Sequence, residues 1–276
     1  MNNELSKIKF LALDIGNTNI VAGVFQGLEL LKQFRISTLP DQTSDELRFK
    51  IVGMCEEHWV DLSGYVVSSV VPSMNRIIEE ALLKKNFQKR SISWITASTR
   101  LSFKVSTTHP EQVGSDRLVN AECAVRDYGI SKSDDRPSLI IVDSGTATTI
   151  CALEFRDGSY QYLGGAIMPG IELSMQTLAS RAAKLFPVDL KQPDSCIGST
   201  TATAIQSGIL FGYSCMLDGM IAKFKKELTP GYRVVATGGV SQLLRGMCAE
   251  IEYIVPDLTL KGLAYLYLNQ KTTNVS

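Results

Sequence analysis

Apolar and polar positions alternate in blocks along this chain, and the blocks predict strands and helices in a repeated order. The stretch Phe10 to Phe25 is an apolar run, an aspartate, a glycine turn and a second apolar run. This pattern is typical of two strands joined by a tight turn. A looser copy of it runs from Leu139 to Phe155. The sequence therefore predicts a β-hairpin at the start of each half of the chain.

The first half continues with alternating strand and helix patterns. Short β-branched or alternating runs predict three further strands, at 28–36, 65–71 and 92–95. Apolar residues at helical spacing predict helices at 44–59 and 74–83, and a third helix at 116–128. The polar segment Ser131 to Pro137 is the expected exposed linker.

The second half repeats this order. We expect strands at 139–142, 149–154, 160–163 and 233–236, and helices at 171–184, 201–226 and 241–249. The apolar stripe of the long helix, which includes Tyr213, is interpreted as core or as a subunit interface. The repetition indicates an internal duplication, and the length suggests roughly two domains. We place these α/β domains at 1–118 and 119–276.

Composition and charge narrow the class of protein. The hydrophobic share is 45% and the charged share 20%, which is ordinary for a soluble globular protein. Lys+Arg and Asp+Glu balance at 28 each, so no global attraction for nucleic acid or an anionic membrane is expected. The polar N-terminus fits neither a signal peptide nor a membrane span. The six scattered cysteines are expected to be buried thiols in a reducing cytosol, which predicts a cytoplasmic protein.

Each hairpin turn carries residue types that suit phosphate binding. Gly16 and Gly145 lack a Cβ, so a phosphate can approach the backbone closely. Asp14 is placed to hold Mg²⁺ through water, because Mg²⁺ prefers few carboxylates together with phosphate oxygens. Uncharged hydrogen-bond donors follow at Asn17, Thr18, Thr146 and Thr148. One such turn also fits an ordinary hairpin, but its repetition favours two turns that face one another across a nucleotide.

The segment His109 to Arg117 has two interpretations. In the first, Ser115 caps a helix and Asp116 lies in the first turn, where the helix dipole favours negative charge. In the second, Asp116 is a general base for a substrate hydroxyl, and Arg117 clamps a carboxylate. Spacing alone does not separate them.

Two glycine-rich segments offer further backbone contacts. Gly164 to Gly170 is expected to follow a strand and open a helix, so that N–H groups near Gly165 face an anion or substrate. Gly238 and Gly239 follow a predicted strand and are expected near an adenine or ribose. The chain lacks the P-loop motif and the dinucleotide-binding glycine motif.

Taken in order, five segments carry a resemblance to a known family: DIGNTN, VGSDRLVNA, DSGTATT, GGAIMPG and IGSTTATAIQSG. From about Phe10 to Leu268 the sequence closely resembles type III pantothenate kinases. These belong to the superfamily of acetate and sugar kinases, heat-shock chaperone ATPases and actin. The resemblance implies two duplicated actin-like (ribonuclease H-like) domains, each a mixed sheet with flanking helices, with a nucleotide cleft between them. It also implies ATP-dependent phosphorylation of pantothenate to 4'-phosphopantothenate, the first step of coenzyme A biosynthesis.

The resemblance assigns roles to individual residues. Asp116 matches the proton acceptor of the family, Asp143 the ligand of a monovalent cation (K⁺ or NH₄⁺), and Thr146 an ATP contact. Thr201 matches a threonine that touches pantothenate, in a site completed by the second subunit of a homodimer. The pantothenate-binding segment corresponds to Gly114, Ser115, Asp116 and Arg117. The first phosphate loop corresponds to Asp14, Ile15, Gly16, Asn17, Thr18, Asn19, Ile20 and Val21.

Two positions depart from the pattern of the family. Thr107 stands where a tyrosine is usual, and Ser144 stands where the second turn usually has an aromatic residue. These departures keep two other functions open. One is a related small-molecule kinase with an altered acceptor pocket, and the other is a non-catalytic accessory or regulatory protein with the same fold.

Overall fold

The chain forms two compact units, which the computed structural model describes over residues 4–84, 90–130 and 135–273. The first unit comprises residues 1–102, 108–123 and 257–276, and the second comprises 103–107 and 124–256. The predicted domains, 1–118 and 119–276, stay a prediction. The units differ from them chiefly in the C-terminal segment, which belongs to the first unit. Residues 131–134 of the predicted linker lie outside the described residues.

The first unit is built on a mixed sheet in the order β3-β2-β1-β4-β5. The strands are β1 (Lys9–Ile15), β2 (Asn19–Gln26), β3 (Glu29–Ser37), β4 (Tyr65–Ser69) and β5 (Ile92–Trp94). The first three form an antiparallel meander, and β4 and β5 continue the sheet parallel to β1. The predicted hairpin and the strands that follow it are confirmed.

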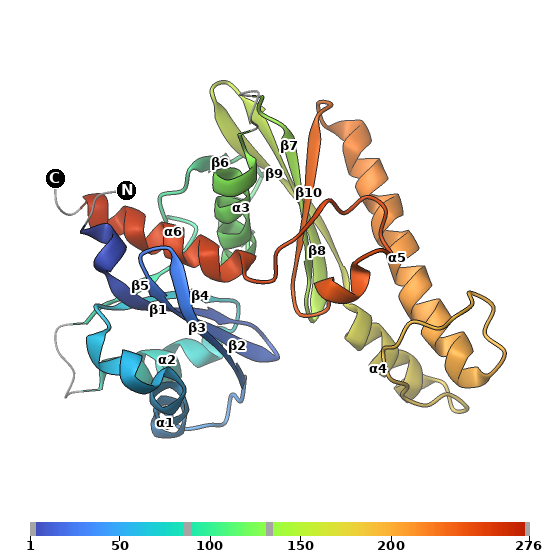
Figure 1. Ribbon diagram of the computed structural model, residues 1–276, viewed down its shortest axis with the longest axis horizontal. Coiled ribbons are helices and arrows are strands. Elements are labelled where there is room, and N and C mark those ends of the chain that lie inside the picture. Colours follow the sequence, from blue (N-terminus) through green and yellow to red (C-terminus); the bar gives the residue numbers. More distant parts are fainter. Residues whose placement is uncertain (1–3, 85–89, 131–134, 274–276) are drawn as a thin grey trace. The chain divides into compact units, whose positions relative to one another are not determined.

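Helices cover both faces of this sheet, which explains why β1 is apolar almost without interruption. Figure 1 shows α1 (Ser44–Cys55) and α2 (Pro72–Leu83) on one face and α6 (Leu258–Thr273) on the other. Leu11 and Leu13 of β1 pack in the core with α1 and α2, whereas Phe10 and Ala12 pack with α6. Successive residues of a strand point to opposite faces, so each face receives every second apolar side chain.

Two features of the first unit differ from the sequence predictions. The helix expected at 44–59 ends at Cys55, because Glu56 takes a positive φ of 53° and a 3-10 helix, η2 (Glu56–Asp61), follows. The C-terminal helix α6 was not predicted. It is apolar around much of its circumference, which hides the helical period. The short 3-10 helices η1 (Leu5–Lys7) and η3 (Pro110–Gln112) complete the unit.

The second unit repeats the strand order of the first. Its sheet runs β11-β10-β7-β8-β9-β6. The strands are β6 (Phe103–Val105), β7 (Ser138–Ser144), β8 (Ala147–Arg156), β9 (Ser159–Pro169), β10 (Tyr232–Thr237) and β11 (Tyr253–Ile254). Strands β9-β8-β7-β10-β11 correspond to β3-β2-β1-β4-β5, with antiparallel and parallel pairings in the same places. The expected α/β fold with an internal duplication is therefore confirmed.

One face of the second sheet packs against α5 (Thr201–Glu227), beside α4 (Ile171–Arg181). The apolar stripe of α5 contributes Leu210, Tyr213 and Leu217 to this core, so the core interpretation of the stripe is confirmed. The prediction of a helix at 241–249 is wrong. Only the 3-10 helix η4 (Ser241–Leu244) forms, and Gly246, at φ 76°, cannot continue an α-helix.

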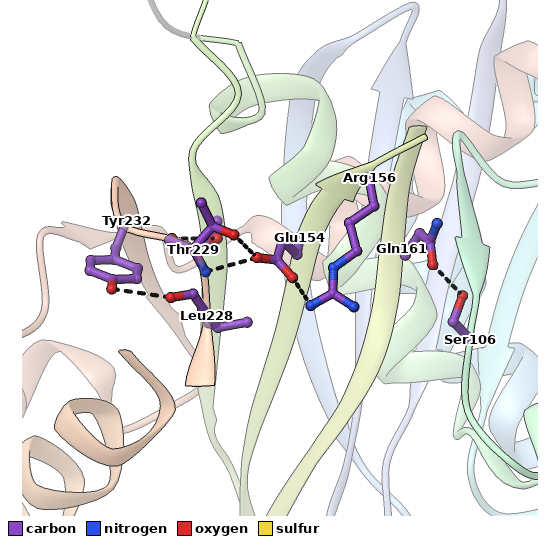
Figure 2. Close-up of polar contacts among 8 residues, drawn as sticks. Ser106, Glu154, Arg156, Gln161, Leu228, Thr229 and Tyr232 are labelled. Atoms are coloured by element: carbon purple, nitrogen blue, oxygen red, sulfur yellow. Dashed lines mark hydrogen bonds and ion pairs between the residues drawn. The ribbon is translucent and has the colours of Figure 1, made fainter. Parts of the chain in front are cut away.

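A buried carboxylate fastens β8 to the segment that enters β10. Glu154 is 2% exposed and accepts a hydrogen bond of 2.8 Å from the Thr229 backbone N–H. The Thr229 hydroxyl and the Arg156 guanidinium also bind this carboxylate, as Figure 2 shows. Burial alone would raise the pKa of Glu154, but these hydrogen bonds and the charge of Arg156 outweigh it and lower the pKa.

The cysteines agree only partly with the expectation of buried thiols. All six are free, but Cys196 and Cys215 are exposed. Cys215 lies on α5 outside the core stripe, and Cys196 lies in the coil before that helix. None of the helices in the described part of the chain is both long and apolar enough to cross a membrane.

Candidate functional site

The first phosphate turn connects β1 to β2 at one edge of the first sheet. Asp14 is opposite Val21 in the antiparallel ladder and opposite Ser68 in the parallel ladder with β4. Asn17 and Thr18 form the exposed tip of the turn. Gly16 donates its N–H to the Asn19 carbonyl at 3.0 Å, which closes the turn. The Gly16 N–H is therefore used inside the turn, and the phosphate role of Gly16 stays a prediction.

The hydrophobic members of the predicted loop face inward. Ile15 and Ile20 are fully buried in the core beneath α1 and α2, and Val21 packs against the core on the other face. Any contact that Ile15 and Ile20 make with a nucleotide therefore involves their backbone.

The acceptor segment lies at the same edge of the first sheet. Helix α3 (Ser115–Tyr128) starts beside the end of β4, where the Ser115 and Ser68 hydroxyls are 3.0 Å apart. The Ser115 hydroxyl also accepts from the Ser69 N–H and donates to the Ser69 carbonyl, both at 3.1 Å. Because Ser68 is the ladder partner of Asp14, these bonds bring the start of α3 next to the first turn.

Ser115 does not cap the helix, contrary to the first of the two interpretations of this segment. The first intrahelical bond, from the Leu118 N–H at 3.2 Å, is accepted by the Gly114 carbonyl, so Gly114 occupies the capping position. The buried Ser115 side chain instead fastens the helix to β4. The Ser115 hydroxyl therefore makes a tertiary contact and does not cap the helix.

Asp116 has the surroundings of a carboxylate prepared to accept a proton. Burial raises its pKa above the ordinary value, against the opposing effects of the Arg117 backbone N–H and the Arg117 charge. The Arg117 N–H donates to Asp116 Oδ1 at 2.8 Å. A Cβ at Gly114 would lie 2.5 Å from the same oxygen, so the glycine leaves room for the carboxylate. The Arg117 guanidinium donates to the Gln112 carbonyl at 3.3 Å.

The second phosphate turn connects β7 to β8 in the second unit. Asp143 is opposite Thr149 in β8 and Thr237 in β10, so Gly238 and Gly239 emerge beside the turn. A Cβ on Gly238 would lie 2.4 Å from the Ser144 carbonyl oxygen. The structure thus places the predicted cation ligand Asp143 in the same unit and beside four residues that the sequence assigned to the nucleotide: Gly145, Thr146, Gly238 and Gly239.

The second turn is closed in the same way as the first. Gly145 donates its N–H to the Ala147 carbonyl at 3.1 Å, which again uses the glycine N–H within the turn. Gly170, just after β9, donates to the Thr146 carbonyl at 3.1 Å. A Cβ on Gly170 would lie 2.2 Å from the Gly145 carbonyl oxygen, so only glycine permits this approach.

Tyr213 fills the space behind the second turn, a role that its sequence pattern did not reveal. Its hydroxyl donates to Ser144 Oγ at 3.4 Å and is hydrogen-bonded to the Thr148 hydroxyl. Burial raises the pKa of Tyr213, so the hydroxyl keeps its proton. Thr148 and Ser144 are both fully buried. The Tyr213 hydroxyl thus lies beside Ser144, and the Thr148 side chain is buried, while the nucleotide role of Thr148 stays a prediction.

Two substrate residues predicted in the second unit lie in different settings. Gly165 is not in a loop before a helix, because β9 continues to Pro169 and pairs Gly165 with Cys151. A Cβ there would lie 2.0 Å from the Ile150 carbonyl oxygen, so strand packing already requires the glycine. Thr201 is exposed at the start of α5, next to the capping residue Thr200. The substrate roles of Gly165 and Thr201 stay predictions.

The predicted metal ligands are two single carboxylates, Asp14 for Mg²⁺ and Asp143 for a monovalent cation. Within the described residues, no group of three or more His, Cys, Asp or Glu side chains is arranged to hold a metal. The roles of Asp14 and Asp143 as metal ligands stay predictions.

Comparison with known proteins shows the family to which the chain belongs. A sequence model of the family described as type III pantothenate kinase matches residues 10–223. The chain belongs to the type III pantothenate kinase family. A relative from Rubrobacter xylanophilus that carries this name is 41% identical, over 93% of this chain and 96% of the relative. The resemblance stated from the motifs is thereby confirmed.

Solved structures show the same fold at low sequence identity. A Baf family transcriptional activator from Campylobacter jejuni aligns over 97% of this chain and 100% of its own, with a TM-score of 0.55 and 17% identity. An inorganic polyphosphate/ATP-glucomannokinase from an Arthrobacter strain aligns over 96% and 99%, with a TM-score of 0.50 and 14% identity. At these identities the likeness concerns the fold alone.

Proposed function

We propose that this member of the type III pantothenate kinase family transfers the γ-phosphoryl group of ATP to the primary hydroxyl of pantothenate. The product is 4'-phosphopantothenate, the first intermediate on the way to coenzyme A. The observation that carries the proposal lies in one unit. The Ser68–Ser115 contact joins the start of α3, and with it Asp116, to the strand beside Asp14 and the glycine turn that follows it.

The chemistry needs little covalent participation from the protein, because phosphoryl transfer depends on positioning and on neutralising charge. Asp116 accepts the proton of the pantothenate hydroxyl, and its raised pKa makes it a better base than an ordinary aspartate. Arg117 pairs with the substrate carboxylate. Asp14 holds Mg²⁺ through water, and this ion neutralises phosphate charge. Asp143 binds K⁺ or NH₄⁺ near the second turn, and a homodimer completes the pantothenate site around Thr201.

The direct test is a coupled assay of ADP release with ATP, Mg²⁺, K⁺ and pantothenate, with the phosphorylated product identified by mass. We expect turnover that falls about 10²–10⁴-fold in Asp116→Asn, the usual contribution of a general base. Asp61→Asn is the matched control, since Asp61 is an exposed partner in a surface ion pair with Lys9 in the same unit. It should leave turnover unchanged. Replacing K⁺ by Na⁺ should lower turnover if Asp143 holds the cation.

The pH profile of the wild type gives an independent check on Asp116. A base must be deprotonated, and burial raises the pKa of this carboxyl. The acid limb of kcat/KM should therefore lie above the pH at which an ordinary aspartate titrates, and it should vanish in the residual activity of Asp116→Asn.

Three outcomes would contradict the proposal in different ways. Full turnover in a folded Asp116→Asn variant would remove this residue from the role of base. Turnover of another alcohol, with none of pantothenate, would indicate a related kinase with an altered acceptor pocket. Nucleotide binding without transfer to any acceptor would indicate the accessory protein.

A further inference from the structure

A buried threonine outside the recognised motifs holds the first phosphate turn in shape. Thr38 follows the last residue of β3 and is 8% exposed. Its hydroxyl donates to the Gly16 carbonyl at 2.7 Å, and its backbone N–H donates to the Thr18 carbonyl at 2.9 Å. Both carbonyls belong to the four-residue turn between Ile15 and Ile20.

The position of Thr38 explains why a polar residue is buried there. In the second half of β3 every second side chain is buried, at Phe34 and Ile36, and Thr38 continues this alternation one step past the strand. A buried hydroxyl requires a hydrogen-bond partner, and the Gly16 carbonyl supplies it. A valine of the same shape would fill the space but would leave that carbonyl without this donor.

Holding the Gly16 carbonyl also sets the direction of an exposed amide. The peptide group is planar and trans, so the Gly16 C=O and the Asn17 N–H point to opposite sides. Because the carbonyl points toward Thr38, the Asn17 N–H is directed away from Thr38 at the exposed tip of the turn. This is the side from which a phosphate approaches a glycine turn.

The second turn has the same backbone hydrogen bond, from the residue that follows the third strand of the unit to a carbonyl of the turn. There the Gly170 N–H binds the Thr146 carbonyl, as the Thr38 N–H binds that of Thr18. Glycine offers no hydroxyl, and the second turn is instead fixed by the close approach of Gly170 and Gly238. The side-chain bond is therefore particular to the first turn.

We propose that Thr38 is a positioning residue for nucleotide binding, acting through the Gly16 carbonyl on the amides of the first phosphate turn. The inference rests on the proposed function, since it takes that turn to bind the phosphates of ATP. Thr38 is buried behind the turn and does not itself touch the substrate. Loss of the Thr38 hydroxyl should therefore lower the affinity for ATP and leave the affinity for pantothenate unchanged.

The test compares Thr38→Val, which loses only the hydroxyl, with Thr38→Ser, which keeps it. We expect the KM for ATP, and the Kd for a non-hydrolysable ATP analogue with Mg²⁺ measured by calorimetry, to rise about tenfold in Thr38→Val, as for a carbonyl that loses its buried donor. The KM for pantothenate should stay constant. Thr38→Ser should restore both ATP constants to within about twofold of the wild type.

Thr43→Val is the matched control for a general loss of stability. Thr43 caps α1 in the same unit by accepting from the Glu46 N–H at 3.2 Å, so its replacement weakens the fold without touching the turn. An unchanged ATP constant in Thr38→Val, or an equal rise in Thr43→Val, would overturn the inference alone. A wild-type protein that binds no nucleotide would overturn both the inference and the proposed function.

Discussion

The close approach of Gly238 to the second phosphate turn can be tested with a pair of glycine substitutions on either side of β10. Gly238 has a φ of 97°, and a Cβ there would lie 2.4 Å from the Ser144 carbonyl oxygen and 2.6 Å from its carbon. Gly231, before the same strand, has a φ of 93°, and its Cβ would meet no atom within 4 Å. Both substitutions, Gly231→Ala and Gly238→Ala, therefore place an alanine at a positive φ. Only Gly238→Ala also brings the new methyl group against neighbouring atoms.

The expected losses in the free energy of unfolding follow from the positive φ and from the contact of the new methyl group. An alanine at positive φ costs about 1–2 kcal/mol of the free energy of unfolding, and both variants incur this. In Gly238→Ala the new methyl group also meets backbone atoms, which cannot turn aside as a side chain can. Such overpacking costs about a further 1–3 kcal/mol. Gly238→Ala should thus be less stable than Gly231→Ala by about 1–3 kcal/mol.

The contact also predicts a functional difference. Relief of the clash must move Ser144, which lies between Asp143 and Gly145 in the second turn. The KM for ATP should therefore rise in Gly238→Ala and stay at the wild-type value in Gly231→Ala. Urea unfolding measures the stability and steady-state kinetics measure the KM.

Equal stability losses in the two variants would refute the argument that the Gly238 backbone packs directly on Ser144. A larger loss in Gly238→Ala with an unchanged KM for ATP would leave the packing argument intact. It would, however, remove Gly238 from the nucleotide site.

Two further predictions concern stability and thiol chemistry. Glu154→Gln should lower the free energy of unfolding at neutral pH by about 1–3 kcal/mol, because the buried side chain would no longer offer a charged acceptor to Thr229 and Arg156. Since folding lowers the pKa of Glu154, this contribution is present above the unfolded-state pKa and is lost as pH falls through the folded-state pKa. The gap between wild type and variant should close in acid, and a constant gap down to pH 3 would refute the assignment. In thiol titration of the native protein, the exposed Cys196 and Cys215 should react at once. The four buried thiols should react only after unfolding, and rapid reaction of all six would contradict their burial: Cys55, Cys123, Cys151 and Cys248.

The sequence was sufficient to predict the fold wherever the apolar pattern is local. Alternation and runs of β-branched residues identified the two hairpins, and helical spacing identified α1, α2 and α5. It failed where tertiary packing decides the structure. The residues of α6 are apolar around much of the helix because it packs against Val119 of α3 as well as against the sheet. A positive φ at Gly246 is incompatible with the expected helix at 241–249.

The sequence indicated the polar candidate residues of the site but not the residues that pack behind them. Short sequence motifs contain the three candidate carboxylates, Asp14, Asp116 and Asp143. Tyr213 and Thr38 are far in sequence from the turns that they support, so no local spacing connects them. One signal for Thr38 was present: a polar residue at the next buried position of an alternating strand. Such a residue indicates a buried hydrogen bond, although it does not name the partner.

The duplicated halves close their turns with the same backbone bond but stabilise them by different means, and this difference has a physical consequence. A turn fixed by glycines that pack on backbone can be changed only by moving the chain, as Gly170 and Gly238 illustrate. A turn fixed by one hydroxyl, as by Thr38, can be altered by a substitution that preserves volume and fold. Nucleotide affinity should therefore be adjustable at the first turn with little loss of stability, whereas substitutions at the second turn should lower affinity and stability together.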